Sequence, residues 1–368
     1  MLQDSPVTNS FIQPRAPVSD IGIEDIFRKA IESQASDIHF TVNLPVIYRI
    51  NGNLIPQETR KLTSQDITTM LSPYMNDLQK KRFETEKETD FSFAFDDSRM
   101  RVNIFYEKGE PAASLRVIPS EVKSFAELGL PPILEKFAAA KQGFFVITGP
   151  TGHGKSTTIA SMLEYINQTR AEHIITIEDP IEYVFHNKKS IVVQREVYSD
   201  TVSFNRALKS ALREDPNVIF LGEMRDQEST SAALTLAETG HLVVTTLHTN
   251  NASQTIDRVV DIFPEHQQRQ IRQQLANTLL GIVSQRLLPR QKGGRTIACE
   301  ILIANVAVKN SIRIGKTHQI PNIIQTSFAE GMMSMDKALI ELVKKGEVKI
   351  EDALVWADNP QTFKQDLY

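Results

Sequence analysis

Eight residues near the middle of the chain restrict its fold more than any other feature of the sequence. Residues 149–156 read GPTGHGKS and match the phosphate-loop pattern G-x-x-x-x-G-K-[ST]. An apolar run at 144–148 leads into this loop, and a helical pattern begins at Ser156. Strand, glycine-rich loop and helix, in that order, are typical of an α/β sheet that binds phosphate at a helix N-terminus. The motif therefore predicts a nucleotide-binding α/β domain.

The residue types in this loop suit ATP and Mg²⁺, which we expect as its cofactors. Glycines let the backbone turn its N–H groups toward phosphate, and Lys155 supplies a positive charge to the β- and γ-phosphates. The hydroxyl of Ser156 is a ligand for Mg²⁺. The predicted nucleotide-binding residues are Gly149, Pro150, Thr151, Gly152, His153, Gly154, Lys155, Ser156 and Thr157.

After the loop, short apolar strands alternate with helical patterns. Strands are expected at 174–177, 218–221 and 242–246, and helices at 204–212, at 228–238 and from 251. This order predicts a parallel sheet with crossover helices. Beyond Pro264 we expect mainly helices up to the C-terminus. An apolar stripe supports that expectation and consists of Ile271, Leu275, Leu279, Ile282 and Leu287.

The first third of the chain has a different pattern and predicts a separate, smaller α/β domain. It contains strands, a hairpin turn at Asn51-Gly52 and a helical pattern over 63–83. Residues 119–132 are rich in proline and predict a linker that acts as a hinge. The predicted domains are a flexible tail at 1–20, a small domain at 21–118, the linker at 119–132 and an ATPase domain with C-terminal helices at 133–368.

Composition narrows the possible partners and the compartment. Lys and Arg number 41 against 45 Asp and Glu, so the net charge is −4 and no nucleic-acid partner is expected. The single cysteine, Cys299, excludes an intrachain disulfide and a cysteine-only zinc site. No apolar run approaches the ~20 residues of a membrane helix, and residues 1–15 do not read as a secretory signal. We therefore expect a cytoplasmic protein.

Acidic side chains follow two of the predicted strands. Glu223 lies two residues after the strand at 218–221, and Glu178 and Asp179 directly follow the strand at 174–177. Because ligands of parallel sheets lie at the carboxyl ends of the strands, Glu223 is a candidate to orient the attacking water. Glu178 and Asp179 are candidates, with Ser156, to hold the metal, directly or through water. An ordinary solvated acidic turn is the alternative for each.

Two histidines, His241 and His248, stand on either side of the apolar strand at 242–246. One of them is a candidate to sense the γ-phosphate, and a purely structural role is the alternative. No third ligand stands near in sequence, so they do not predict a zinc site.

Four of these blocks together resemble the secretion and pilus ATPase superfamily, and most of all the PilT-type pilus-retraction ATPases of twitching motility. The blocks are the phosphate loop, IITIEDPIE at 174–182, GEMRD at 222–226 and AETGH at 237–241. The resemblance spans about residues 21–363. It implies a homohexamer whose subunits have a PAS-like α/β N-terminal domain and a RecA-like P-loop ATPase domain with a helical C-terminal portion.

The resemblance also implies roles for individual residues. Glu223 is similar to the catalytic glutamate, and Glu178 to a residue that places Mg²⁺ or water. His241 and His248 are similar to a pair that couples nucleotide state to the subunit interface. Arginines of the small domain reach a neighbour's nucleotide in such rings, and the matching residues here are Arg101 and Arg116.

The function implied is an ATP-hydrolysing motor that retracts type IV pili. Its partners would be a platform protein of the inner membrane, at whose cytoplasmic face the ring would sit, and other pilus motor ATPases. This sequence departs from the family at His153, where a small residue is usual, and in the element at 307–314. The alternatives are a pilus-assembly or type II or type IV secretion ATPase, a nucleic-acid motor and a non-catalytic ring subunit.

Overall fold

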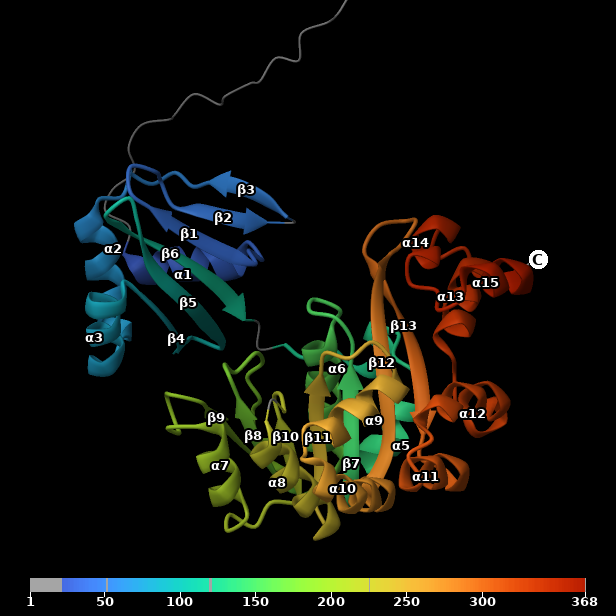
Figure 1. Cartoon of the computed structure of the whole chain (residues 1–368). Helices are drawn as coiled ribbons and strands as arrows, with labels where there is room; N and C mark the ends of the chain where they lie inside the picture. The colour runs from blue at the N-terminus through green and yellow to red at the C-terminus, as the bar shows by residue number, and fades with distance from the viewer. Residues whose placement is uncertain (1–21, 51, 119–120, 225, 368) are drawn as a thin grey trace, which may run out of the picture. The chain divides into compact units, whose positions relative to one another are not determined.

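The computed structural model describes residues 22–50, 52–118, 121–224 and 226–367. The chain divides into two compact units, Met1–Ser120 and Glu121–Tyr368, each with its own sheet (Figure 1). The prediction of an α/β protein with a small N-terminal domain and an ATPase-like domain is confirmed. Asn51, part of the predicted hairpin turn, and the tail at 1–20 lie outside the described residues. Within the described residues, no helix has the length and hydropathy needed to cross a membrane.

The first unit is an antiparallel sheet with the strand order β3-β2-β1-β6-β5-β4. Its strands are β1 (Asp37–Thr41), β2 (Ile47–Ile50), β3 (Asn53–Pro56), β4 (Glu88–Phe95), β5 (Ser98–Glu107) and β6 (Glu110–Ile118). Its helices are α1 (Ile23–Glu32), α2 (Ser64–Leu71) and α3 (Asp77–Glu86). Alternate residues of the strands, such as Ile38 and Phe40, join one core with these helices. The other sheet face carries polar side chains, as expected for an antiparallel sheet covered on one side.

The helix expected over 63–83 is two helices in the structure. Each begins with a capping box, in which Thr63 and Asn76 cap α2 and α3. Pro73 lies in the short 3₁₀ turn Ser72–Tyr74 that separates them. Proline cannot donate the backbone hydrogen bond that a continuous helix needs, so the helical pattern is interrupted there.

The second unit contains a seven-stranded sheet with the order β13-β12-β7-β11-β10-β8-β9. Its strands are β7 (Gly143–Thr148), β8 (His173–Glu178), β9 (Ile191–Glu196), β10 (Val218–Leu221), β11 (Leu242–Leu247), β12 (Leu279–Pro289) and β13 (Arg295–Ile303). All neighbouring pairs are parallel except β12 and β13. The helices joined to this sheet are α4 (Phe125–Leu128), α5 (Ile133–Ala139), α6 (Lys155–Thr169), α7 (Phe204–Ala211), α8 (Gln227–Glu238), α9 (Ala252–Asp261) and α10 (Glu265–Thr278).

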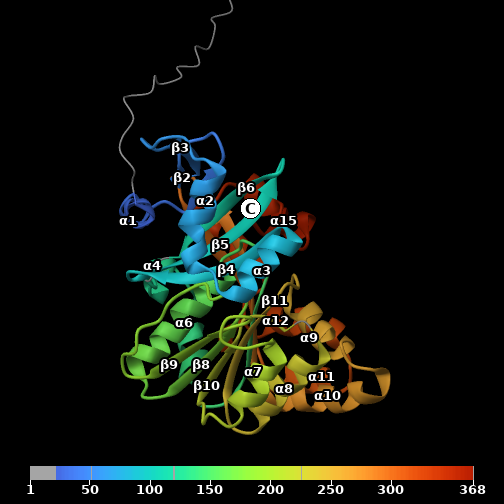
Figure 2. The ribbon, with the colours of Figure 1, turned by 90° about the vertical axis from the view of Figure 1, so that its left-hand side faces the viewer.

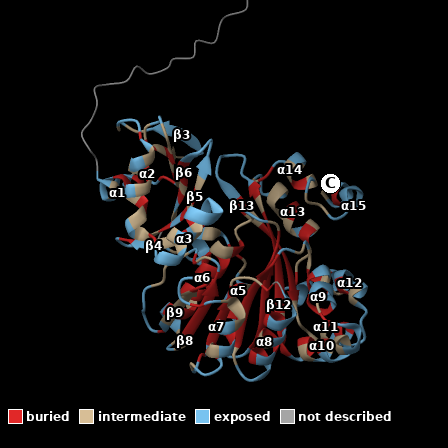
Figure 3. Cartoon of the chain, turned by 60° about the vertical axis from the view of Figure 1, so that its left-hand side comes forward, coloured by how far each residue is buried: buried red, intermediate tan, exposed pale blue. Residues whose placement is uncertain are grey.

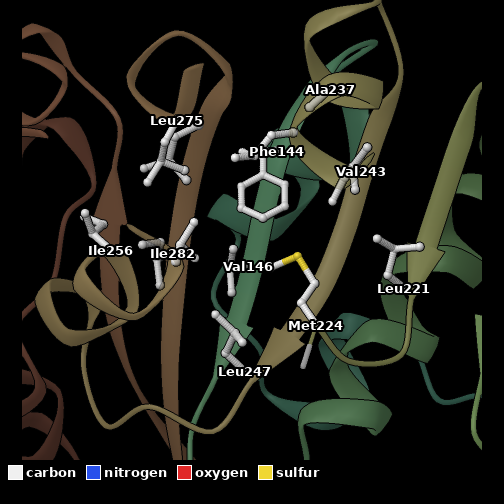
Figure 4. Packing of buried hydrophobic residues seen from close by; sticks show 14 of the residues in the cluster. Phe144, Val146, Leu221, Met224, Ala237, Val243, Leu247, Ile256, Leu275 and Ile282 are labelled. Carbon is white, nitrogen blue, oxygen red and sulfur yellow. The ribbon is translucent and has the colours of Figure 1, made fainter. Parts of the chain in front are cut away.

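Helices cover both faces of this sheet, as Figure 2 shows with α6 on one side and α8 and α10 on the other. Strand β7 supplies both cores: Phe144 and Val146 pack with α8 to α10, and Phe145 and Ile147 pack with α5 and α6. Figure 4 shows the first of these cores, and in Figure 3 the strands are the most continuously buried part of the unit. This double cover fixes the central strands and therefore the loops that leave their ends.

Residues 279–303 correct the prediction of helices beyond Pro264. Helix α10 ends at Thr278, and Leu279, Ile282 and Leu287 of the predicted apolar stripe lie on strand β12. Most residues of β12 are buried, because the two cores on either side of the sheet cover both of its faces. A strand buried on both faces shows no alternation of apolar and polar residues, so the spacing of its apolar residues cannot distinguish it from a buried helix. The helical prediction is therefore wrong for β12 and β13.

The C-terminal helices, α11 (Val306–Arg313), α12 (Ile320–Thr326), α13 (Met335–Lys344), α14 (Ile350–Leu354) and α15 (Pro360–Leu367), follow as predicted. Helices α13 to α15 form a core of their own with Leu288 and Ala298 of the β12–β13 ribbon. The stretch predicted as a linker is largely folded, because residues 121–132 belong to the second unit and contain α4. Phe125 and Leu130 of that stretch are buried in its core.

Candidate functional site

The phosphate loop connects β7 to α6, as the sequence motif predicts. Gly149, Gly152 and Gly154 all have positive φ, at 144°, 81° and 81°. At Gly149 a Cβ atom would lie 2.5 Å from the backbone oxygen of Gln285 on β12, so only glycine fits there. Gly154 is the N-cap of α6, so the loop ends at a helix N-terminus that can bind an anion.

Lys155 is the first residue of α6, and its side chain folds back under the loop. Lys155 is 8% exposed. Its Nζ donates to the backbone oxygens of Gly149 (2.8 Å) and Pro150 (3.0 Å). Nζ also lies 3.4 Å from Nδ1 of His248. Burial lowers the pKa of Lys155, whereas the charges of Glu182 and Glu223 oppose that shift. The lysine is therefore held in place under the loop, within reach of the charges of Glu182 and Glu223.

His248 connects the lysine to the catalytic carboxylate predicted from the sequence. The ammonium group of Lys155 can only donate, so Nδ1 of His248 accepts and its proton lies on Nε2. That Nε2 atom is 3.6 Å from Oε1 of Glu223. Strand β11 lies between β7 and β10 in the sheet, so its carboxyl end brings His248 between the phosphate loop and Glu223. Thr246 fixes the neighbouring strand end by donating to the backbone oxygen of Gly222 (2.5 Å).

Glu178 is buried at the end of β8 and faces three donors. Its Oε1 accepts from Thr176 Oγ1 (2.6 Å) and Gln194 Nε2 (3.2 Å), and its Oε2 accepts from the backbone N–H of Glu182 (3.3 Å). Burial raises the pKa of Glu178 to about 7, despite these hydrogen bonds. In this structure the carboxyl group therefore ties β8 to β9 and to the loop at 179–182.

The predicted metal ligands do not form a preformed carboxylate site. Within the described residues, no group of three His, Cys, Asp or Glu side chains is arranged to hold a metal ion. Asp179 is exposed, and the oxygens of Glu178 are engaged as described. Ser156 lies in the first turn of α6, directly after Lys155. A metal at this site would therefore take its other ligands from phosphate oxygens and water, which is usual for Mg²⁺.

His241 lies at the other end of strand β11 from His248 and does not contact the phosphate loop of its own chain. It precedes β11, and its backbone oxygen accepts from Gly143 at the start of β7. Its Nδ1 donates to the backbone oxygen of Leu236 (2.9 Å). Strand β11 has six residues and spans about 20 Å, so about that distance separates His241 at its N-terminal end from His248 at its C-terminal end.

Arg101 and Arg116 belong to the first unit and are cross-strand partners on β5 and β6. Both are exposed, and Arg116 Nε donates to Asp37 Oδ1 at 3.0 Å. They lie on the polar face of the antiparallel sheet, opposite the face that α1 to α3 cover. Asp37 therefore already offsets the charge of Arg116 within the unit.

Several residues of the site were not predicted from the sequence. Gln285 Nε2 donates to the backbone oxygen of His153 (2.7 Å), and Tyr183 shares a 2.8 Å hydrogen bond with the hydroxyl of Thr157. Gln285 lies on β12, which the sequence pattern placed in a helix, so nothing connected it to the loop. Tyr183 directly follows the block at 174–182, and this position in the sequence is the one feature that could have indicated its place in the site.

The chain is similar to several known proteins. Residues 13–354 match the family described as Type II/IV secretion system protein. The chain is 44% identical over 342 residues to the type IV pilus retraction ATPase PilT of Pseudomonas aeruginosa, covering 93% of this chain and 99% of that protein. It is 45% identical over 335 residues to a twitching motility protein of Neisseria gonorrhoeae, covering 90% of this chain and 89% of that one.

A solved structure agrees with these sequence relatives. The crystal structure of the pilus retraction motor PilT with bound ADP superposes with a TM-score of 0.87 and 48% identity, covering 94% of this chain and 100% of that one. Similarity of this extent includes both sheets and the phosphate loop. The resemblance to pilus-retraction ATPases inferred from four short motifs is thereby confirmed, and the chain belongs to the Type II/IV secretion system protein family.

Proposed function

We propose that this protein is an ATPase motor that powers the retraction of type IV pili. The observation that carries the proposal is the connected set Lys155, His248 and Glu223 at the carboxyl edge of the sheet. It joins a phosphate-binding lysine to a carboxylate able to act on water. The relatives named above support the direction of movement, because retraction and twitching motility are the activities their names state.

The phosphate loop has the geometry that ATP requires. Its glycines open the backbone N–H groups toward a phosphate, and the N-terminus of α6 adds a favourable dipole. On binding, the ammonium group of Lys155 exchanges its contacts with Gly149 and Pro150 for the β- and γ-phosphate oxygens. The hydroxyl of Ser156 would hold Mg²⁺, which neutralises charge on the phosphates when bound.

Glu223 is the residue we assign to the attacking water. The water oxygen forms a bond to the γ-phosphorus, the bond from that phosphorus to the ADP oxygen breaks, and Glu223 orients the water and accepts its proton. His248 carries its own proton on Nε2 toward Glu223, so it stabilises the carboxylate without taking the water proton. Glu178 positions the loop after β8, and Asp179 reaches the metal at most through water.

The active assembly we propose is a homohexamer in the cytoplasm, at the inner face of the inner membrane. In it, Arg101 and Arg116 of one subunit contact the nucleotide of its neighbour, and His241 takes part at the subunit interface. An arginine supplied from a neighbour increases phosphoryl-transfer rates by roughly 10³- to 10⁵-fold. The ring would act on a membrane platform protein of the pilus and work with other pilus motor ATPases.

The variant Glu223→Gln tests the catalytic assignment. We expect it to bind ATP with nearly unchanged affinity and to lose at least about a hundred-fold in turnover, because an amide cannot accept the water proton. Phosphate release from the purified ring measures the turnover. Glu228→Gln is a matched control, since that exposed carboxylate on α8 pairs with Lys209. Wild-type turnover in Glu223→Gln would refute the assignment.

Deletion of the gene tests the direction of movement. A retraction motor leaves accumulated surface pili when it is lost, and an assembly motor leaves none. We expect accumulated pili, and we expect that complementation with Glu223→Gln fails to remove them. Cells without pili would instead favour the assembly ATPase.

A further inference from the structure

The residue in the middle of the phosphate loop, His153, is fastened to strand β12 at two points. Its Nδ1 accepts from the backbone N–H of Leu287 at 3.0 Å, and its backbone oxygen accepts from Gln285 Nε2 at 2.7 Å. Strand β12 pairs with β7 only as far as Ser284 and Thr148, because β7 ends there. Beyond that point the imidazole of His153 takes the place of the missing strand partner.

The side chain that covers His153 comes from the C-terminal helices. Trp356 follows α14, and its ring meets the imidazole edge-on, with centroids 4.9 Å apart and planes at 78°. The guanidinium carbon of Arg286 lies 5.1 Å from the centre of the same indole ring. Arg286 donates in turn to the backbone oxygen of Asn250 (2.9 Å), in the loop that begins with His248. Trp356 therefore contacts one loop of the site and reaches a second through Arg286.

The imidazole is chemically suited to this contact. Burial lowers the pKa of His153, and the nearby charges of Arg286 and Lys155 lower it further. The ring is therefore neutral at pH 7, with its proton on Nε2, so that Nδ1 can accept the Leu287 N–H. A serine at this position would be too short to reach both Leu287 and Trp356.

From these contacts we infer that His153 and Trp356 form a latch through which the C-terminal helices position the phosphate loop for nucleotide. Helices α13 to α15 share a core with the end of the β12–β13 ribbon, so the latch joins the loop to a packed body rather than to a free segment. The loop is thereby ordered before phosphate arrives, and less conformational entropy is lost on binding. His153 and Trp356 are positioning residues, and their role deepens the proposed ATPase function.

The test is the affinity of the full-length protein for ADP, measured by calorimetry. We expect His153→Ser and Trp356→Leu each to weaken ADP binding about ten-fold, from the loss of a hydrogen bond and an aromatic contact. The double variant should be no weaker than either single one, because both changes open the same latch. Val355→Ala is the matched control, since Val355 adjoins Trp356 but is 73% exposed. Trp356→Phe keeps an aromatic ring, so we expect it to bind ADP nearly as tightly as the wild type.

Fluorescence supplies a second readout, because Trp356 is the single tryptophan of the chain. ADP should change its emission in the wild type and leave it unchanged in His153→Ser, even at saturating ADP. Single variants that bind ADP like the wild type, or losses that add in the double variant, would overturn the latch. If the wild type itself fails to bind ADP, both the proposed ATPase function and the latch are refuted.

Discussion

The buried carboxyl group of Glu178 predicts how the stability of the second unit depends on pH. Burial raises its pKa to about 7 in the folded chain, from an ordinary value of 4.5. Between these two values the folded state keeps a proton that the unfolded state has released, so stability falls as the pH rises through this window. At 1.36 kcal/mol for each pH unit, the gap corresponds to about 3 kcal/mol lost above pH 7.

Glu178→Gln removes the ionisation while keeping most of the contacts. The amide oxygen still accepts from Thr176 and Gln194, and the amide nitrogen no longer accepts from the Glu182 N–H, which costs about 1 kcal/mol. At pH 5 the variant should therefore be slightly less stable than the wild type. From pH 5 to pH 8 the difference should move in favour of the variant by about 3 kcal/mol.

Urea unfolding followed by the emission of Trp356 measures this difference, because that tryptophan lies in the same unit as Glu178. Asp179→Asn is the control, since it removes a neighbouring carboxylate that is exposed. We expect it to leave the pH dependence of the wild type in place. A Glu178→Gln variant whose stability parallels the wild type at both pH values would show that Glu178 does not hold the extra proton.

Three further substitutions test other contacts of the site. Gly149→Ala places a Cβ atom 2.5 Å from the backbone oxygen of Gln285, so we expect a lower melting temperature and at least a ten-fold loss of ADP affinity by calorimetry. Normal ADP binding by this variant would contradict the close approach. His248→Gln should lower turnover roughly ten- to hundred-fold at saturating ATP in a phosphate-release assay, and full turnover would remove His248 from the mechanism. Tyr183→Phe should destabilise the chain by about 1 kcal/mol in thermal unfolding, and an unchanged midpoint would mean that its bond to Thr157 contributes nothing.

The central part of the sheet could be predicted from the sequence because its signals are local. Strands β7, β8, β10 and β11 are short apolar runs with turn or loop residues at their ends, and each precedes a residue with evident chemistry. The phosphate loop, Glu178, Glu223 and His248 were predicted for this reason, and all lie at the carboxyl ends of parallel strands. Strand β9 was missed because it is an edge strand with partly exposed, mixed residues.

The direction of a strand decides which of its ends can reach a ligand, and this explains why His248, and not His241, lies beside the phosphate loop. One apolar strand separates His241 from His248 in the sequence, so the two histidines lie at opposite ends of that strand. Strand β11 runs parallel to β7, and Leu247 pairs with Thr148 just before the phosphate loop. Only the residue after Leu247 can therefore lie beside that loop. The parallel order was itself predicted, so the sequence already contained the information needed to separate the two histidines.

Strand β12 could not be separated from a helix by the same reasoning, and the consequences reach the site. A strand buried on both faces has no alternation, so its apolar residues fit a helical stripe equally well. The helical prediction gave no reason to place Gln285 at the carboxyl edge of the sheet, where its side chain donates to the phosphate loop. It also left His153 as an unexplained large residue in a glycine-rich loop. Where β12 extends past the end of β7, its free edge needs a partner, and a histidine long enough to reach that edge supplies it.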